Sequence, residues 1–178
     1  MNFSYLDFNK KVKNNNGLVT ALIILDKAIT YCTVIIYFIY LLYGFKRIPV
    51  DGGTLLYRSI LVPGVSFIIV SIYRKVLSSP RPYEVYGFAP IIEKDTVGKS
   101  FPSRHVFSIF IIAVTVMQSS IALGLIIMFF GCALGFIRVA GGVHFIKDVI
   151  AAAILAIIIG IICYFFLGGV LGLLVLPF

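Results

Sequence analysis

The sequence contains two histidines, His105 and His144, and both lie among residues that suit phosphate chemistry. Asp148 follows His144 by four residues, so the two side chains share a face if this segment is helical. A carboxylate that binds one ring nitrogen fixes the tautomer and leaves the other nitrogen free to attack. His105 follows Ser103, a good helix N-cap whose helix would point its first N–H groups at an anion. Taken alone, an interfacial His–Asp pair and a plain helix cap are equally simple interpretations.

Arginines accompany the histidines. Arg74 and Arg81 flank Lys75 in one polar segment, and Arg138 lies six residues before His144. The planar guanidinium group matches phosphate oxygens in pairs and stays charged near lipid. If these arginines converge, they can bind a phosphoryl group and the extra charge of its transition state. The alternative is that they are loop cations facing lipid headgroups.

The composition places these residues in a membrane protein. Hydrophobic residues make up 61% of the 178 residues and charged residues only 12%, and the mean hydropathy is +1.09. Soluble domains average about 25% charged residues. The net charge of +8 is distributed between apolar blocks, and no nucleic-acid-binding motif accompanies it. We therefore expect the bilayer and a phosphorylated lipid as partners, and no nucleic acid.

Five apolar blocks are long enough, or nearly so, to cross a bilayer, at about residues 28–45, 54–73, 106–119, 121–137 and 149–167. They predict an all-α, polytopic membrane helix bundle with about five transmembrane helices, in a single domain over residues 1–178. The apolar segment 17–27 ends in Asp26-Lys27 and is interpreted as an N-terminal interfacial helix. The alternative, a first span that begins at Gly17, leaves this charged pair inside the span at a cost.

If all five blocks cross, the segments 74–104 and 138–148 lie on the same side of the membrane as the N-terminus. Both histidines and most of the cations are in these two segments. The other side carries little besides Lys46, Arg47 and Asp51. The sequence therefore predicts that the candidate site residues lie together on one side of the membrane.

The order and spacing of these residues resemble the type 2 phosphatidic acid phosphatase family, which shares its site with vanadium haloperoxidases. The family pattern is a lysine, six residues and Arg-Pro, then Pro-Ser-Gly-His, then Ser-Arg, five residues, His, three residues and Asp. The corresponding residues lie within 74–148 and are Arg74 with Arg81-Pro82, Pro102-Ser103-Arg104-His105, and Ile137-Arg138 with His144 and Asp148.

The sequence departs from this pattern at three positions. Arg74 replaces the family lysine, although Lys75 stands one residue away as an alternative. Arg104 replaces the glycine of the second motif, and Ile137 replaces the serine of the third. None of these changes removes a nucleophile or a proton donor, so they bear on the substrate more than on the reaction.

The resemblance implies that His144 attacks phosphorus to form a phosphohistidine, that Asp148 orients it, and that His105 protonates the leaving oxygen and then helps to activate water. It implies no metal and no other cofactor. It also implies a phosphate-binding set, and together with the departures we expect this set to be Arg74, Lys75, Arg81, Ser103, Arg104 and Arg138.

The resemblance implies a lipid phosphate or diphosphate as substrate. Undecaprenyl diphosphate, phosphatidylglycerol phosphate and phosphatidic acid are the alternatives, and the added charge of Arg104 leads us to expect the diphosphate. Counting cations near the spans favours a cytoplasmic site. Phosphate binding accounts for most of these cations, however, and the resemblance implies the extracytoplasmic face of the cell membrane, which we expect.

Two other functions fit the same residues. A lipid phosphotransferase would pass the phosphoryl group from His144 to an alcohol instead of water. A non-catalytic protein would use the cations only to hold an anionic lipid.

Overall fold

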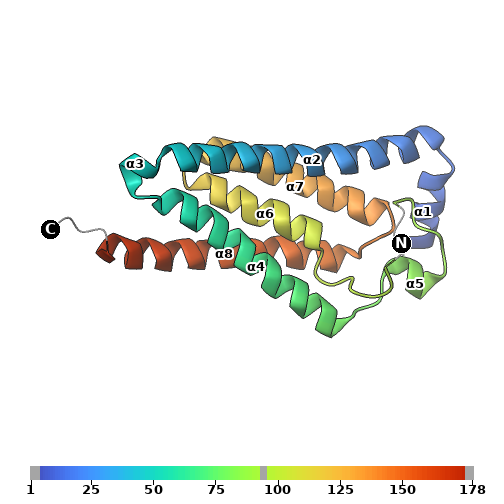
Figure 1. Ribbon diagram of the computed structural model, residues 1–178. Coiled ribbons are helices and arrows are strands. Elements are labelled where there is room, and N and C mark those ends of the chain that lie inside the picture. The colour runs from blue at the N-terminus through green and yellow to red at the C-terminus, as the bar shows by residue number, and fades with distance from the viewer. Residues whose placement is uncertain (1–4, 93–95, 175–178) are drawn as a thin grey trace.

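The computed structural model describes residues 5–92 and 96–174, and every regular element in these ranges is a helix (Figure 1). The long helices form one bundle, in which the short helices α1, α3 and α5 lie at the ends. This arrangement confirms the predicted all-α membrane bundle. The helices are α1 Tyr5–Lys13, α2 Asn16–Lys46, α3 Ile48–Asp51, α4 Thr54–Leu77, α5 Pro82–Tyr86, α6 Arg104–Met117, α7 Ile121–Ala140 and α8 Ile146–Leu174.

The first long helix differs from the expectation. Residues 17–27 are not a separate interfacial helix but the first turns of α2, which Asn15 caps by accepting a hydrogen bond from the Leu18 N–H at 3.1 Å. Asp26 therefore lies inside a long apolar helix, where a lone carboxylate is costly. That cost is offset because Arg138 of α7 forms an ion pair with it. The short helix before the bundle is instead α1, which runs across the bundle's end (Figure 1).

The predicted third span is a short, enclosed helix. The 14 residues of α6 are about 21 Å long, whereas a hydrocarbon core is about 30 Å thick. It packs against α2, α4, α7 and α8, and many of its side chains are fully buried. A helix that its neighbours cover does not have to match the bilayer. In the described part of the chain, four segments have the length and hydropathy to cross a membrane: Asn16–Lys46, Thr54–Tyr86, Ile121–Ala140 and Ile146–Phe166.

The predicted hairpin of the third and fourth blocks is present as α6 and α7, which only three residues join. The two helices approach closely at Gly131. A Cβ at that position would lie 2.7 Å from a ring carbon of Phe110, which no packed structure tolerates. The absence of a side chain on Gly131 therefore lets α7 lie against α6, the helix whose first turn contains His105.

The two polar links meet at one end of the bundle. The link from α4 to α6, which contains α5, and the link from α7 to α8 lie at the end where α1 is found (Figure 1). The opposite end carries α3 and the C-terminal part of α8. The fold therefore gathers the two motif-bearing segments at one end, as the sequence predicted.

Candidate functional site

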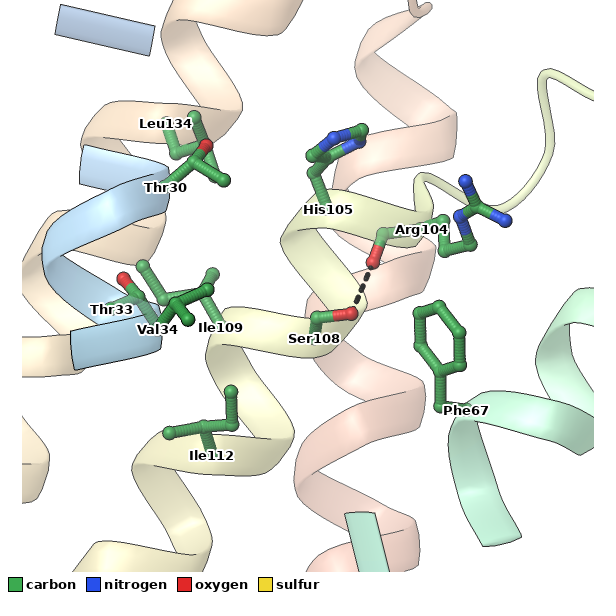
Figure 2. A pocket seen from close by; sticks show the side chains of 10 residues that line it. All are labelled: Thr30, Thr33, Val34, Phe67, Arg104, His105, Ser108, Ile109, Ile112 and Leu134. Carbon is green, nitrogen blue, oxygen red and sulfur yellow. Dashed lines mark hydrogen bonds between the residues drawn. The ribbon is translucent and has the colours of Figure 1, made fainter. Parts of the chain in front are cut away.

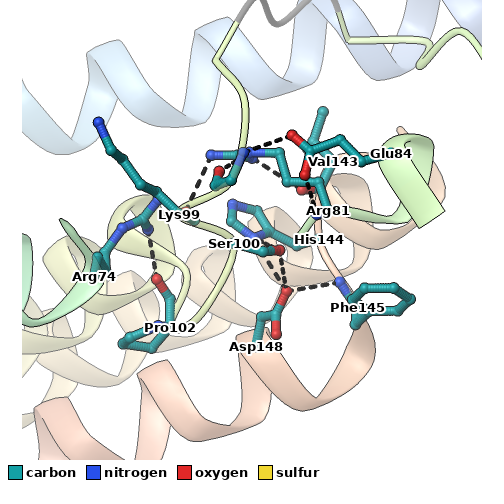
Figure 3. A network of polar contacts seen from close by, with 11 residues as sticks. Arg74, Arg81, Glu84, Lys99, Ser100, Pro102, Val143, His144, Phe145 and Asp148 are labelled. Carbon is teal, nitrogen blue, oxygen red and sulfur yellow. Dashed lines mark hydrogen bonds and ion pairs between the residues drawn. The ribbon is translucent and has the colours of Figure 1, made fainter. Parts of the chain in front are cut away.

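His144 is buried between α7 and α8 and is paired with the first turn of α8. Its Nδ1 lies 3.5 Å from Oδ2 of Asp148, and both residues are at most 1% exposed. The same carboxylate oxygen accepts the backbone N–H of Phe145 at 3.0 Å and the hydroxyl of Ser100 (Figure 3). These contacts occupy the Nδ1 edge of the ring, so Nε2 is the nitrogen left for another partner.

Ser100 is a site residue that the sequence did not reveal. Its Oγ donates to Asp148 and lies 3.4 Å from Nδ1 of His144. A buried carboxylate needs several donors, and this requirement is the one signal that pointed to a further residue. A serine in a polar segment has many uses, however, and only the fold brings residues 100 and 148 together.

The burial of His144 decides its charge. Burial lowers its pKa to about 4, and the positive charges of Arg81 and Arg74 act in the same direction. The hydrogen bond and negative charge of Asp148 raise the pKa and only partly oppose these effects. At neutral pH the imidazole is therefore neutral, which is the form that can attack an electrophile.

Arg74 and Arg81 lie beside the segment 98–102, which passes close to His144. Both side chains donate hydrogen bonds to backbone carbonyls. Arg81 donates from Nη1 to the Val143 carbonyl at 3.0 Å and from Nη2 to the Lys99 carbonyl at 3.3 Å (Figure 3). Its Nε donates to the Gly98 carbonyl at 2.9 Å. Arg74 donates to the carbonyls of Lys99 and Pro102. Gly98 and Lys99 both have left-handed backbone angles, with φ of 65° and 56°. The groups that accept from these two side chains are neutral carbonyls, and neither guanidinium group forms a direct ion pair in the described part of the chain.

A polar cavity of about 290 Å³ brings the two histidines together. Arg74 is buried there, whereas Lys75 is exposed, so the residue at the family lysine position reaches deeper than its neighbour. Thr96 and Lys99 also face this cavity and were not among the predicted site residues. The lining residues are Ser71, Arg74, Lys75, Arg81, Thr96, Lys99, Arg104, His105 and His144.

Two predicted phosphate ligands are not among the residues that line the polar cavity. Ser103 is fully buried at the N-cap position of α6, but its hydroxyl caps nothing and has no partner among the described residues. The expected side-chain cap is therefore wrong, and the backbone N–H of Ser103 instead donates to the Asp148 carbonyl at 3.0 Å. Arg138 directs Nε and Nη2 to Asp26, at 2.8 and 3.0 Å.

An apolar groove of about 220 Å³ adjoins the polar cavity (Figure 2). Arg104 and His105 line both spaces, so they stand where the two meet. The guanidinium carbon of Arg104 lies 5.5 Å from the ring centre of Phe67 on α4, an arrangement that favours a cation over the ring face. The groove is lined by Thr30, Thr33, Val34, Phe67, Arg104, His105, Ser108, Ile109, Ile112 and Leu134.

Among the residues that the structure describes, the lining of the polar cavity contains two histidines and no aspartate, glutamate or cysteine. Within the described ranges, no group of three or more His, Cys, Asp or Glu residues is placed to hold a metal ion. The site's recognition chemistry is therefore that of arginine, lysine and imidazole, which suits a phosphorylated ligand.

The protonation of His144 gives a prediction that needs no substrate. The imidazole should stay neutral as the pH falls and gain a proton only near pH 4, because burial lowers its pKa to about that value. A ¹⁵N NMR titration of the histidines in detergent, with His144→Gln to assign the signals, measures this. Asp148→Asn should lower the midpoint further, because the carboxylate raises the pKa of His144. A midpoint near 6.5, the value of a free imidazole, would show that the ring is not buried.

Comparison with solved structures places this fold among known proteins. The crystal structure of LpxE from Aquifex aeolicus matches with a TM-score of 0.65 and 21% identity over 91% of this chain and 96% of that chain. The crystal structure of a transmembrane PAP2 type phosphatidylglycerolphosphate phosphatase from Bacillus subtilis matches with a TM-score of 0.50 and 18% identity over 91% of both chains. At these identities the likeness is one of fold. No curated protein matches the sequence significantly.

The sequence itself matches a family description. The match is to the PAP2 superfamily and covers residues 55–170, which include both histidines, the arginines around them and Asp148. Because the match spans well over half of the chain, this protein belongs to the PAP2 superfamily.

Proposed function

We propose that this protein is a metal-independent phosphatase of membrane lipids that works through a phosphohistidine. The observation that carries the proposal is a neutral His144, oriented by Asp148, in a cavity that it shares with His105 and with Arg74 and Arg81. Membership of the PAP2 superfamily and an apolar bundle that can hold a lipid tail support it.

In the first step, Nε2 of His144 attacks phosphorus and the bond to the leaving oxygen breaks. Protonated His105 gives a proton to that oxygen, so a lipid alcohol departs neutral and a lipid monophosphate departs with one negative charge fewer. Asp148 accepts the hydrogen bond from Nδ1–H and stabilises the positive charge that the ring gains. In the second step, water loses a proton to His105 and breaks the P–N bond, which releases phosphate and restores both histidines.

Arg74 and Arg81 are the proposed ligands of the phosphoryl oxygens, with Lys75 at the edge of the polar cavity. Donors that are already fixed in place cost no reorganisation when charge develops in the transition state. The carbonyls that hold both arginines supply this preorganisation. Ser103 and Arg138, which the resemblance assigns to the phosphate, stay outside this set because they do not line the polar cavity.

The test is phosphate release from a lipid panel by purified protein in detergent with a chelator present. The wild type should turn over at least one of undecaprenyl diphosphate, phosphatidylglycerol phosphate and phosphatidic acid. His144→Ala should lower kcat by about a thousandfold or more, because it removes the nucleophile. Unchanged function in His144→Ala would favour a lipid-binding protein, and transfer of phosphate to an added lipid alcohol would favour a phosphotransferase.

We propose an isoprenoid diphosphate as the substrate, and the position of Arg104 supports this choice. A terminal phosphate in the polar cavity places the next phosphate toward Arg104, at the entrance of the apolar groove. The groove can then take the first part of the lipid tail. Phosphatidic acid has a single phosphate, so it would leave Arg104 with less to bind.

Arg104→Ala tests this choice. It should lower kcat/KM for undecaprenyl diphosphate by about tenfold or more, because a charge-assisted hydrogen bond is lost, and leave phosphatidic acid within about twofold. Lys147→Ala is a matched control: Lys147 is also an exposed cation in a first helical turn, beside the ring of Phe145, and lies outside the polar cavity. Equal losses on both lipids would contradict a role for Arg104 in selecting a diphosphate.

The polar cavity is proposed to face the extracytoplasmic side. Val97, in the link near the cavity, is 81% exposed, and Val50 of α3 at the opposite end is 73% exposed. In intact cells a membrane-impermeant maleimide should therefore label Val97→Cys, and label Val50→Cys only after permeabilisation. The reverse pattern would place the site in the cytoplasm.

A further inference from the structure

Asp26 and Arg138 form a buried ion pair between α2 and α7. Nε of Arg138 lies 2.8 Å from Oδ1 of Asp26, and Nη2 donates to Oδ2 at 3.0 Å. Both residues are less than 10% exposed. Two parallel contacts between a planar guanidinium and a carboxylate fix both side chains, in contrast to a single flexible contact.

The backbone of Arg138 holds the turn that carries His144. Its carbonyl accepts the N–H of Val143 at 3.2 Å and the N–H of His144 at 3.3 Å. The other side of this turn is tied to Arg81, which donates to the Val143 carbonyl at 3.0 Å. The turn is therefore held between the end of α7 and one of the arginines of the polar cavity.

We propose that Asp26 is a positioning residue, which anchors Arg138 to α2 and thereby fixes the 141–145 turn that places the His144 ring in the polar cavity. The inference rests on the proposed function for its catalytic consequence. It assigns a role in the site to α2, which lies outside the residues that match the family.

Removal of the Asp26 carboxylate should displace the backbone that supports His144, because Arg138 would lose its buried partner. Without the carboxylate, the guanidinium group of Arg138 is a buried charge without its partner, and such a group moves toward water or toward an anion. Arg138 lies in the last turn of α7, where few helical hydrogen bonds hold the backbone, so the carbonyl that supports His144 moves with the side chain. An error of about 1 Å in a reacting group can cost about a hundredfold in rate.

The experiment uses Asp26→Asn, Arg138→Gln and the double variant. Asp26→Asn should lower kcat by about ten- to hundredfold and leave KM within about threefold, because Arg74 and Arg81 still bind the phosphate. The double variant should be no slower than Arg138→Gln, because Asp26 acts only through Arg138. Rates that fall by the product of the two single effects would overturn the inference.

Hydrogen exchange measured by mass spectrometry gives a readout that does not need turnover. The amides of residues 141–145 should exchange faster in Asp26→Asn than in wild type, while those in the middle of α6 keep their rates. Asp51→Asn is the matched control, because Asp51 is a carboxylate at the opposite end that accepts the Gly53 N–H at 2.9 Å. It should change neither kcat nor exchange in the turn.

The two proposals can fail separately. A wild type that releases no phosphate from any lipid would count against the proposed function, and a turn that loosens in Asp26→Asn would still support the anchoring role. An active enzyme whose turn exchanges at the same rate in Asp26→Asn would overturn the anchoring role and leave the phosphatase proposal intact. Uniformly faster exchange over the whole bundle would also overturn it, because Asp26 would then serve general stability alone.

Discussion

The site depends on how an apolar bundle satisfies buried arginines. A guanidinium group cannot be left without partners away from water, and this chain has few carboxylates to offer. Arg74 and Arg81 are held by backbone carbonyls of the two polar links, and Arg138 is held by Asp26. Each solution fixes a backbone segment as well as a side chain, so the charges that suit phosphate also set the shape of the site.

The two kinds of partner have different consequences. A carbonyl fills a guanidinium's hydrogen bonds without cancelling its charge, whereas a carboxylate cancels it. Arg74 and Arg81 line the polar cavity with Lys75, Lys99 and Arg104 and contribute positive charge to it, whereas Arg138 is paired with Asp26. Burial, and after it the charges of Arg81 and Arg74, lower the pKa of His144 and keep the ring unprotonated at neutral pH, so the same cations that suit an anion also favour the neutral imidazole.

The short central helix α6 joins the polar and apolar parts of the molecule. It is enclosed by α2, α4, α7 and α8, and its first residues, Arg104 and His105, line both the polar cavity and the apolar groove. A lipid phosphate has the same division, with a charged head and a hydrocarbon tail. The start of α6 thus lies where the two parts of such a molecule would join.

The sequence by itself determined the solvent, the helical class and the two motif-bearing links, because long apolar blocks and the spacing of His144 and Asp148 are local properties of the chain. It also indicated a cost at Asp26, since a carboxylate in an apolar segment needs a partner. It did not identify Arg138 as that partner or Ser100 as a donor to Asp148. It also predicted that a helix ends at residue 27, whereas α2 continues through this position because Arg138 pairs with Asp26. Those contacts join residues 112 and 48 positions apart. Only the packing of α2 against α7, and of the long link against α8, decided them, because buried polar groups take whichever partners the tertiary structure brings within reach.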